Sequence, residues 1–357
     1  MASESKRPAG SDAAKHALTA ETAKKGAWIR APTKFHESIS NDGSTPFPAA
    51  AGRYRLYHAP ACPWANRCTA VIKLKGLGHV IEVVAVGDDL LELGNATPGA
   101  YRGWNFRADG SSDPDGWGFD HIDQLYEMAA PGFRKSYEAQ GRAPYYSVPV
   151  LFDKETKKIV NNESAEIIVM LNSQFNAFAT NPDLDLAPSD LADAMDAIND
   201  KVYPYINDGV YRSGFARAQE AYTDAVTKLF ETLDWLEDIL SRQRYTTGDR
   251  LTLADIRLWS TLVRFDMVYV THFKCNIRRL HDYPNLWGFM LEITQLPTPD
   301  GGKLGDTVLP DHIKAHYYGS HRGINPFGII PVGFEIDLAE PHGRDKKFPV
   351  AEESATA

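Results

Sequence analysis

Cys62 has the setting of a reactive thiol. It follows an alternating apolar and polar run at 53–58 that predicts a strand, and it precedes Pro63, which suits the first turn of a helix. The free N–H groups and the dipole at a helix N-terminus favour a negative charge, so we expect Cys62 to be acidic and largely ionised at neutral pH. The alternative, which applies to most lone cysteines, is a buried and inert side chain.

The predicted helix after Cys62 lacks the second cysteine that dithiol oxidoreductases carry three residues beyond the first. Ala65 occupies that place. Cys68 lies nearly two turns further on, about 9 Å away by helical rise, which is too far for easy pairing, so we interpret it as a packing residue. Cys62 would therefore form a mixed disulfide that an external thiol resolves, and the abundant cytosolic thiol is glutathione.

Two further segments suit glutathione. In Tyr146-Ser147-Val148-Pro149 the proline opens a strand, which indicates a cis peptide and leaves the backbone of Val148 able to pair with the peptide backbone of glutathione. Residues 161–166, Asn-Asn-Glu-Ser-Ala-Glu, predict a helix N-terminus whose amides and hydroxyl suit the γ-glutamyl carboxylate. Plain helix capping by Asn162 or Ser164 is the alternative for this segment.

A thioredoxin-like domain would bring these segments together. Residues 53–86 predict a strand, a helix and a buried parallel strand, while 148–160 predict a hairpin and 163–172 a helix. This order is the thioredoxin arrangement. Residues 87–144 are interrupted by Gly, Asp and Pro clusters, and we expect them to form an insertion rather than a second core.

The rest of the chain divides into two extensions and a helical domain. Residues 1–50 lack sustained periodicity, so we expect them to lie on the surface or to be partly disordered, and to carry no chemistry. We place the thioredoxin-like α/β domain at 51–180, an all-α domain at 181–297, and a tail that wraps the domains at 298–357. The packing stripe of the helical domain consists of Tyr222, Val226, Leu229, Leu233, Leu236 and Leu240.

Composition narrows the class of protein. The 357 residues contain 38 Lys and Arg against 47 Asp and Glu, and a net charge of −9 disfavours a general nucleic-acid surface. Three cysteines cannot build a disulfide framework, and no apolar run approaches the roughly 18 residues of a membrane span, so we expect a soluble cytoplasmic protein. His312 and His316 have a metal-ligand spacing but no accompanying carboxylate motif, so we expect no metal.

With these residues identified, the chain resembles a glutathione transferase, and specifically the Xi class, the glutathionyl-hydroquinone reductases, over residues 45–345. The pairs Val148-Pro149 and Glu163-Ser164 occur in most glutathione transferases and indicate only the superfamily. The narrower motifs are Cys-Pro-Trp-Ala at 62–65, Gly-Trp-Asn-Phe-Arg at 103–107, Asn-Asp-Gly-Val-Tyr at 207–211, His-Phe-Lys-Cys at 272–275 and His-Tyr-Tyr at 316–318. The loop 298–305 looks longer than the family's, and we expect it to alter access to the site.

The resemblance implies the glutathione transferase fold, a homodimer, and a reaction in which a glutathionyl-hydroquinone and glutathione give hydroquinone and glutathione disulfide. Cys62 would attack the substrate sulfur. Because an aryl carbanion cannot leave directly, the ring must first be protonated at the sulfur-bearing carbon, which requires proton donors near the ring. Family matching assigns Tyr211 as the main donor, with Tyr269 and Tyr317 beside it and Tyr318 as a fallback.

The resemblance also supplies binding residues. Trp104 is expected to cover glutathione, although it could simply pin the insertion to the core, and Arg107 is expected to pair with a carboxylate. The expected binding set is Trp104, Arg107, Tyr145, Tyr146, Ser147, Val148, Pro149, Glu163 and Ser164. Two other functions stay open: an Omega-like thiol transferase or dehydroascorbate reductase, and a non-catalytic carrier of aromatic ligands.

Overall fold

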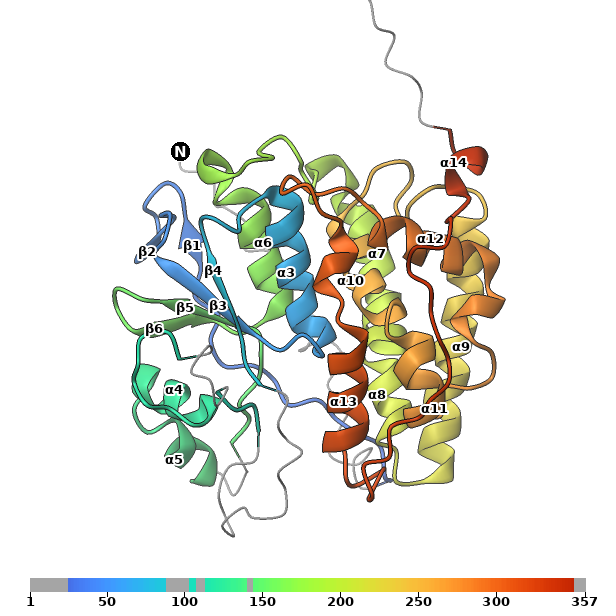
Figure 1. Ribbon diagram of the computed structural model, residues 1–357, viewed down its shortest axis with the longest axis horizontal. Helices are drawn as coiled ribbons and strands as arrows, with labels where there is room; N and C mark the ends of the chain where they lie inside the picture. The colour runs from blue at the N-terminus through green and yellow to red at the C-terminus, as the bar shows by residue number, and fades with distance from the viewer. Residues whose placement is uncertain (1–24, 88–102, 107–112, 140–143, 350–357) are drawn as a thin grey trace, which may run out of the picture.

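The computed structural model describes residues 25–87, 103–106, 113–139 and 144–349, which form a sheet domain beside a helical domain (Figure 1). The strands are β1 (Ile39–Ser40), β2 (Phe47–Pro48), β3 (Tyr54–His58), β4 (Glu82–Ala85), β5 (Val150–Asp153) and β6 (Lys158–Asn161). The helices of the sheet domain are α3 (Pro63–Lys75), α4 (Ile122–Ala129), α5 (Phe133–Glu138) and α6 (Ser164–Ser173). Those that follow are α7 (Ala192–Val202), α8 (Gly209–Gly214), α9 (Gln219–Leu240), α10 (Leu253–Leu262), α11 (Val270–His272), α12 (Pro284–Thr294), α13 (Pro310–Ser320) and α14 (Arg344–Lys347).

Four strands form the central sheet in the order β4-β3-β5-β6. β3 runs parallel to β4, with Leu56 opposite Val83, and antiparallel to β5, with Leu56 opposite Leu151. α3 connects the two parallel strands, and Gly76 ends it in a left-handed conformation that a glycine adopts without strain. The β5–β6 hairpin leads into α6. The predicted thioredoxin order is confirmed.

The two faces of the sheet are both covered. Because side chains alternate along a strand, Leu56 joins the main hydrophobic core while the adjacent Tyr57 joins a second cluster on the opposite face. That second cluster includes Leu125 of α4 and Phe133 of α5. The expectation that 87–144 adds no second core is therefore wrong for its described part, since these short helices bury one face against the sheet.

The N-terminal segment lies on the surface over residues 25–38, none of which is buried, but it enters the core at β1 and β2, contrary to expectation. β1 and β2 pair in parallel, and Ile39 and Phe47 are buried in the main core. The side chain of Asn161 in β6 donates to the carbonyl of Glu37 at 3.0 Å. Two-residue strands are too short to produce a periodic pattern, which is why the sequence does not reveal them.

The structure of the helical domain and of the C-terminal tail follows the predictions more closely. The stripe on α9 packs as predicted, since its residues from Val226 to Leu240 are buried in the main core. The tail runs along the helical domain to α14, where buried Arg344 donates to Glu292 of α12 at 2.8 Å (Figure 1). The tail also contributes α13, which packs against the π-helical turn Phe265–Tyr269.

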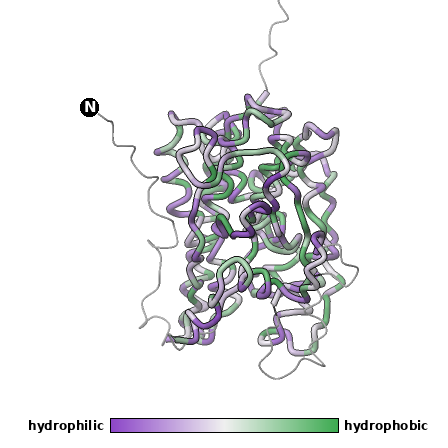
Figure 2. The backbone as a smooth tube through the Cα atoms, turned by 90° about the vertical axis from the view of Figure 1, so that its left-hand side faces the viewer, coloured by the Kyte–Doolittle hydropathy of each residue, from purple (hydrophilic) through white to green (hydrophobic). Residues whose placement is uncertain are grey.

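Buried residues of α9 such as Leu229, Leu233 and Leu236 recur every three or four positions, and Figure 2 shows hydrophobic and hydrophilic stretches mixed along the chain. This is the pattern of amphipathic helices that bury one side and expose the other. Among the described residues, none of the helices combines the length and the apolar character needed to cross a membrane.

Candidate active site

Cys62 is the N-cap residue of α3, and Pro63 occupies the first helical turn, as predicted. The Cys62 thiol donates to the carbonyl oxygen of Val148 across 3.6 Å. The Val148–Pro149 peptide is cis, as the sequence indicates. The thiol thus faces the backbone that we expect to hold glutathione, and only 9% of Cys62 is exposed.

The structure contradicts the prediction that Cys62 is an acidic thiol. Burial raises the pKa of Cys62, and this effect outweighs the lowering by the Ala65 and Trp64 amides and by the guanidinium groups of Arg264 and Arg30. A helix N-terminus favours a thiolate, but removal of the thiolate from water opposes it. Cys62 must therefore lose a proton before it can attack.

The other two cysteines are core residues. Cys68 and Cys275 are both fully buried in the main core, and all three cysteines are free thiols. Burial raises the pKa of Cys68 well above its usual value. The interpretation of Cys68 as a packing residue is confirmed.

A narrow cleft beside Cys62 brings together most of the expected glutathione-binding residues. It is lined by Arg30, Ala31, Pro32, Thr33, Trp64, Tyr145, Ser147, Val148, Pro149, Asn162, Glu163, Ser164 and Tyr203. The volume is about 40 Å³, well below the roughly 300 Å³ at which ligand pockets usually start. In this conformation the cleft is therefore too small to enclose a tripeptide.

Glu163 lines this cleft at the N-terminus of α6. Its Oε1 accepts a hydrogen bond from the Ala165 amide at 3.1 Å, so Glu163 caps the helix, rather than Asn162 or Ser164. Its Oε2 accepts from the Thr33 hydroxyl at 3.1 Å. The alternative of capping by Asn162 or Ser164 is therefore wrong, and the residue that caps the helix also lines the cleft.

Arg30 is a site residue that the sequence did not indicate. Its Nε donates to Asp208 at 2.9 Å, and its guanidinium lies 4.1 Å from the centre of the Trp64 ring and 5.0 Å from that of Tyr211. It lies in the aperiodic N-terminal segment, where nothing distinguishes one arginine from another. Its position at the cleft raises the question of whether residues 1–50 carry no chemistry, as we expected.

Two of the expected binding residues do not line the cleft, and a third cannot be placed from the described residues. Tyr146 packs into the second hydrophobic cluster, with its ring centre 5.3 Å from that of Tyr126. Trp104 stacks on His316 of α13, with ring centres 4.7 Å apart, which matches its alternative role of pinning the insertion. Arg107 lies outside the described residues.

Three tyrosines from different elements meet through their hydroxyl groups. Tyr317 on α13 lies 2.7 Å from Tyr211 on α8 and 3.1 Å from Tyr269 of the π-helical turn, measured between oxygens. Burial raises the pKa of Tyr269 to about 12, and it also raises the pKa values of Tyr211 and Tyr317 well above the usual value for tyrosine. All three phenols are therefore protonated at neutral pH. Tyr318, the fallback, instead donates to the Met267 carbonyl at 3.2 Å.

Histidines surround the tyrosine cluster. His272 and His321 face each other with 3.1 Å between Nε2 and Nδ1, and burial lowers the pKa of His272 to about 3 and that of His321 to about 4. His316 and His312 both lie on α13, as the predicted spacing requires. Within the described part of the chain, no group of three or more His, Cys, Asp or Glu side chains is arranged to hold a metal ion.

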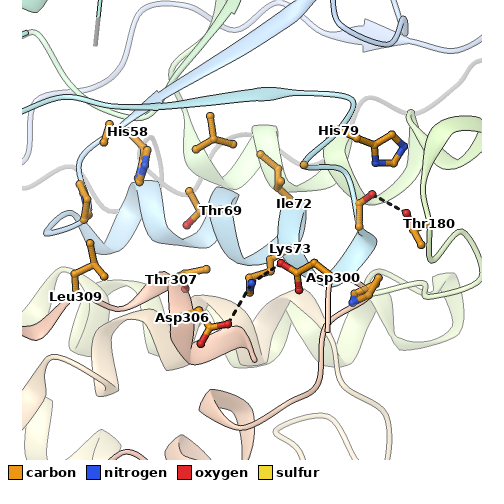
Figure 3. Close-up of a pocket in the computed structure, with 16 residues that line it drawn as sticks. His58, Thr69, Ile72, Lys73, His79, Thr180, Asp300, Asp306, Thr307 and Leu309 are labelled. Carbon is orange, nitrogen blue, oxygen red and sulfur yellow. Dashed lines mark hydrogen bonds and ion pairs between the residues drawn. The ribbon is translucent and has the colours of Figure 1, made fainter. Parts of the chain in front are cut away.

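A larger cavity, about 590 Å³, shares no lining residue with the cleft. β3, β4 and α3 form its walls together with residues 299–309, and Lys73 lies between Asp300 and Asp306 across its mouth (Figure 3). The Lys73 Nζ lies 2.6 Å from Asp300 and 3.3 Å from Asp306. The loop 298–305 thus borders this cavity, and its effect on access to the Cys62 site stays a prediction.

Comparisons with known proteins agree with this geometry. Residues 219–291 match the family described as the C-terminal domain of glutathione S-transferases. The chain is 44% identical over 332 residues to glutathionyl-hydroquinone reductase YqjG of Escherichia coli (strain K12), which covers 90% of this chain and 94% of that protein. It is 45% identical over 288 residues to glutathionyl-hydroquinone reductase PcpF of Sphingobium chlorophenolicum, covering 80% and 84%.

Solved structures give the same result. The glutathione-bound structure of E. coli YqjG superposes with a TM-score of 0.78 at 44% identity and covers 91% of this chain and 99% of that one. The glutathione S-transferase Xi of Phanerochaete chrysosporium superposes with a TM-score of 0.76 at 41% identity, covering 88% and 95%. The chain therefore belongs to the Xi-class glutathione transferases, the family of the glutathionyl-hydroquinone reductases.

Proposed function

We propose that this protein removes glutathione reductively from glutathionyl-hydroquinones through a Cys62–glutathione mixed disulfide. The observation that carries the proposal is a single thiol at the head of a helix, near three hydrogen-bonded phenols. A negative charge on Cys62 would raise the pKa values of Tyr211 and Tyr269, and the ring of Trp64, two residues after Cys62, lies 6.4 Å from that of Tyr211. Relatives named glutathionyl-hydroquinone reductases, at 44% and 45% identity, support the same activity.

The first step breaks the carbon–sulfur bond of the substrate. The ring takes up a proton at the sulfur-bearing carbon and becomes a keto tautomer. The Cys62 thiolate then attacks the substrate sulfur, a Cys62–glutathione disulfide forms, and the electron pair of the broken bond returns to the ring as an aromatic phenolate. The cysteine sulfur is oxidised and the ring is reduced, so no other redox group is needed.

Tyr211 is the proton donor in this scheme, with Tyr317 and Tyr269 behind it. A phenol that stays protonated at neutral pH can give its proton to the sulfur-bearing ring carbon and recover one from the ring hydroxyl that becomes the keto oxygen. The phenolate released by attack on sulfur then takes up the proton that Cys62 lost. Tyr317 lies within hydrogen-bond distance of both other hydroxyls, so it can stabilise a transient phenolate on Tyr211.

The second step regenerates the thiol. A second glutathione attacks the mixed disulfide, releases glutathione disulfide, and leaves Cys62 as a thiolate. We place the peptide backbone of glutathione against Val148 and its γ-glutamyl carboxylate at the N-terminus of α6, beside Ser164. Both positions line the cleft next to Cys62.

Two other functions are separated from this one by simple assays. An Omega-like thiol transferase would reduce dehydroascorbate faster than it cleaves a glutathionyl-hydroquinone. A carrier of aromatic ligands would bind without turnover, and Cys62→Ser would leave its binding unchanged. The hydrogen-bonded tyrosine cluster favours the hydroquinone reaction, because dehydroascorbate reduction needs no proton donor to an aromatic carbon.

We also propose a cytoplasmic homodimer that uses glutathione as co-substrate and needs neither a metal nor a nucleic-acid or membrane partner. The family resemblance supports the dimer. The net charge of −9 supports the absence of a nucleic-acid partner, and the three free cysteines support a cytoplasmic location.

Intact-mass analysis after mixing with a glutathionyl-hydroquinone tests the proposal directly. One added glutathione should appear on the wild-type protein and disappear when glutathione is supplied. Cys62→Ser should show no adduct, while Cys68→Ser should retain it. A wild-type protein that releases hydroquinone without ever carrying the adduct would exclude the mixed-disulfide route.

A further inference from the structure

Arg264 has an unusual position for a charged residue. It lies between α10 and the π-helical turn that carries Tyr269, and its exposed fraction is 0%. Its Nε donates to the Ala61 carbonyl at 3.0 Å and one Nη donates to the Pro60 carbonyl at 2.9 Å. The helical domain thus holds, through Arg264, the two residues that precede Cys62.

The remaining contacts of Arg264 are neutral as well. Its other Nη donates to Oδ1 of Asn66 at 3.0 Å and to the Ser260 carbonyl at 2.7 Å. Within the described residues, no carboxylate pairs with this guanidinium. Two other buried arginines differ in this respect, since Arg55 pairs with Asp115 and Arg344 with Glu292.

Burying a cation without a counter-ion costs free energy, so the buried and unpaired charge of Arg264 needs an explanation. Hydrogen bonds to carbonyls satisfy the donors of Arg264 but leave its full positive charge in a region of low dielectric. Such a charge favours any anion that forms nearby. The proposed reaction forms one at Cys62, the residue that follows two of the carbonyls bound by Arg264.

We propose that Arg264 is a positioning residue that fixes the Cys62 turn and, resting on the proposed function, supplies the buried positive charge that compensates the thiolate. Arg264 therefore has no anionic partner until Cys62 ionises, and the thiolate then provides one. The same charge also favours phenolate on Tyr269 and Tyr317. One side chain thus supports the nucleophile and the proton donors from the same place.

Other titratable groups also act on the Cys62 thiol. Arg30 from the N-terminal segment favours ionisation, as Arg264 does. Four groups would oppose ionisation of the Cys62 thiol if they were themselves negatively charged. They are Cys68 on α3, Tyr145 before β5, Tyr211 on α8 and Tyr269 in the π-helical turn. All four stay protonated near neutral pH because burial raises their pKa values, so the two arginines provide the charge that matters there.

The test is the pH dependence of Cys62 alkylation by iodoacetamide, followed on the Cys62 peptide by mass spectrometry. Arg264→Gln should raise the midpoint by about one pH unit, a tenfold loss of alkylation rate at pH values below it. Arg264→Lys keeps the charge and should stay within about 0.3 unit of wild type.

Lys75→Gln is the matched control. Lys75 is also fully buried, and it also bridges to carbonyls, those of Pro182 and Leu184 at 3.0 and 2.7 Å. It lies at the opposite end of α3, about 20 Å from Cys62 by helical rise. The Lys75→Gln substitution should lower the melting temperature without changing the pH midpoint of Cys62 alkylation.

A second variant keeps the proposal testable if Arg264→Gln fails to fold. Asn66→Asp places a carboxylate against the guanidinium and should raise the midpoint, whereas Asn66→Ala removes the same amide without adding charge and should raise it less. An unchanged midpoint in folded Arg264→Gln, or in Asn66→Asp, overturns the proposal. The assay contains no hydroquinone, so its result is independent of whether the proposed activity is correct.

Discussion

The hydroxyl oxygen of Tyr317 lies 2.7 Å from that of Tyr211, although the two residues are 106 positions apart in the chain. α13, from the C-terminal extension, thus completes a cluster that begins on α8. Tyr269 joins it at 3.1 Å from Tyr317. Because Tyr317 contacts both other hydroxyls, a proton lost from Tyr211 can be compensated without any movement of the backbone.

Tyr211→Phe should reduce turnover of a glutathionyl-hydroquinone by about a hundredfold, which is typical for loss of a general acid. Resolution of a preformed Cys62–glutathione disulfide requires no ring protonation, so it should change by less than about twofold. Stopped-flow measurement of the two half-reactions separates these effects. Equal losses in both would mean that Tyr211 is not the proton donor.

Tyr318→Phe is the matched control for that experiment. Tyr318 is also buried and its hydroxyl also makes a hydrogen bond, but the acceptor is the Met267 carbonyl, away from the cluster. We expect little change in either half-reaction and a modest loss of stability, of about 1 kcal/mol.

Alkylation of Cys62 should accelerate with pH through a midpoint above the ordinary cysteine value of about 8.5. The reason is that burial raises the pKa of Cys62, so the neutral thiol is favoured in the folded protein. Iodoacetamide labelling between pH 6 and 10 measures the midpoint, and Cys62→Ser corrects for Cys68 and Cys275. A midpoint well below 8 would restore the acidic thiol that the sequence predicts.

Acid should destabilise the protein through its buried histidines. Burial lowers the pKa of His272 to about 3 and that of His321 to about 4, whereas an unfolded histidine titrates near 6.5. Below pH 6.5 the unfolded state therefore binds more protons, and the stability present above that pH is lost as the pH falls. Melting temperatures should change little between pH 7.5 and about pH 6.5 and should decline from there to pH 5.

His321→Gln should reduce the loss of unfolding free energy with falling pH by roughly 1 kcal/mol per pH unit between pH 6 and 5, which is the effect of one proton. Exposed His79 provides the control, and His79→Gln should leave the slope unchanged. Parallel curves for wild type and His321→Gln would show that His321 does not remain neutral in the folded protein.

Local signals explain why the thioredoxin order could be predicted. Alternation marks β3, Pro63 marks the start of α3 and Gly76 marks its end, and each signal depends on only a few neighbouring residues. The position of Cys62 at the head of α3 follows directly from them. The electrostatic state of Cys62 does not, because burial depends on how distant elements close over the thiol.

The tyrosine cluster shows a second limit of sequence reasoning. Nothing in the residues around Tyr211, Tyr269 or Tyr317 indicates that their hydroxyls meet, and only the family resemblance selects them among 16 tyrosines. The N-terminal segment shows a third limit. Its contacts with the cleft come from an extended chain without periodicity, so Arg30 and Thr33 could not be singled out.

Arg30→Met tests whether that segment is part of the site. Glutathione carries a net negative charge, and Arg30 is a partly buried cation in the cleft that we assign to it, so the KM for glutathione should rise by about tenfold or more. Arg53→Met removes a comparable arginine that pairs with Asp153 on the sheet, and it should leave this KM unchanged. Steady-state kinetics at saturating glutathionyl-hydroquinone would measure both. If the KM of Arg30→Met stays at the wild-type value, the arginine only anchors the N-terminal segment through Asp208 and does not contribute to binding.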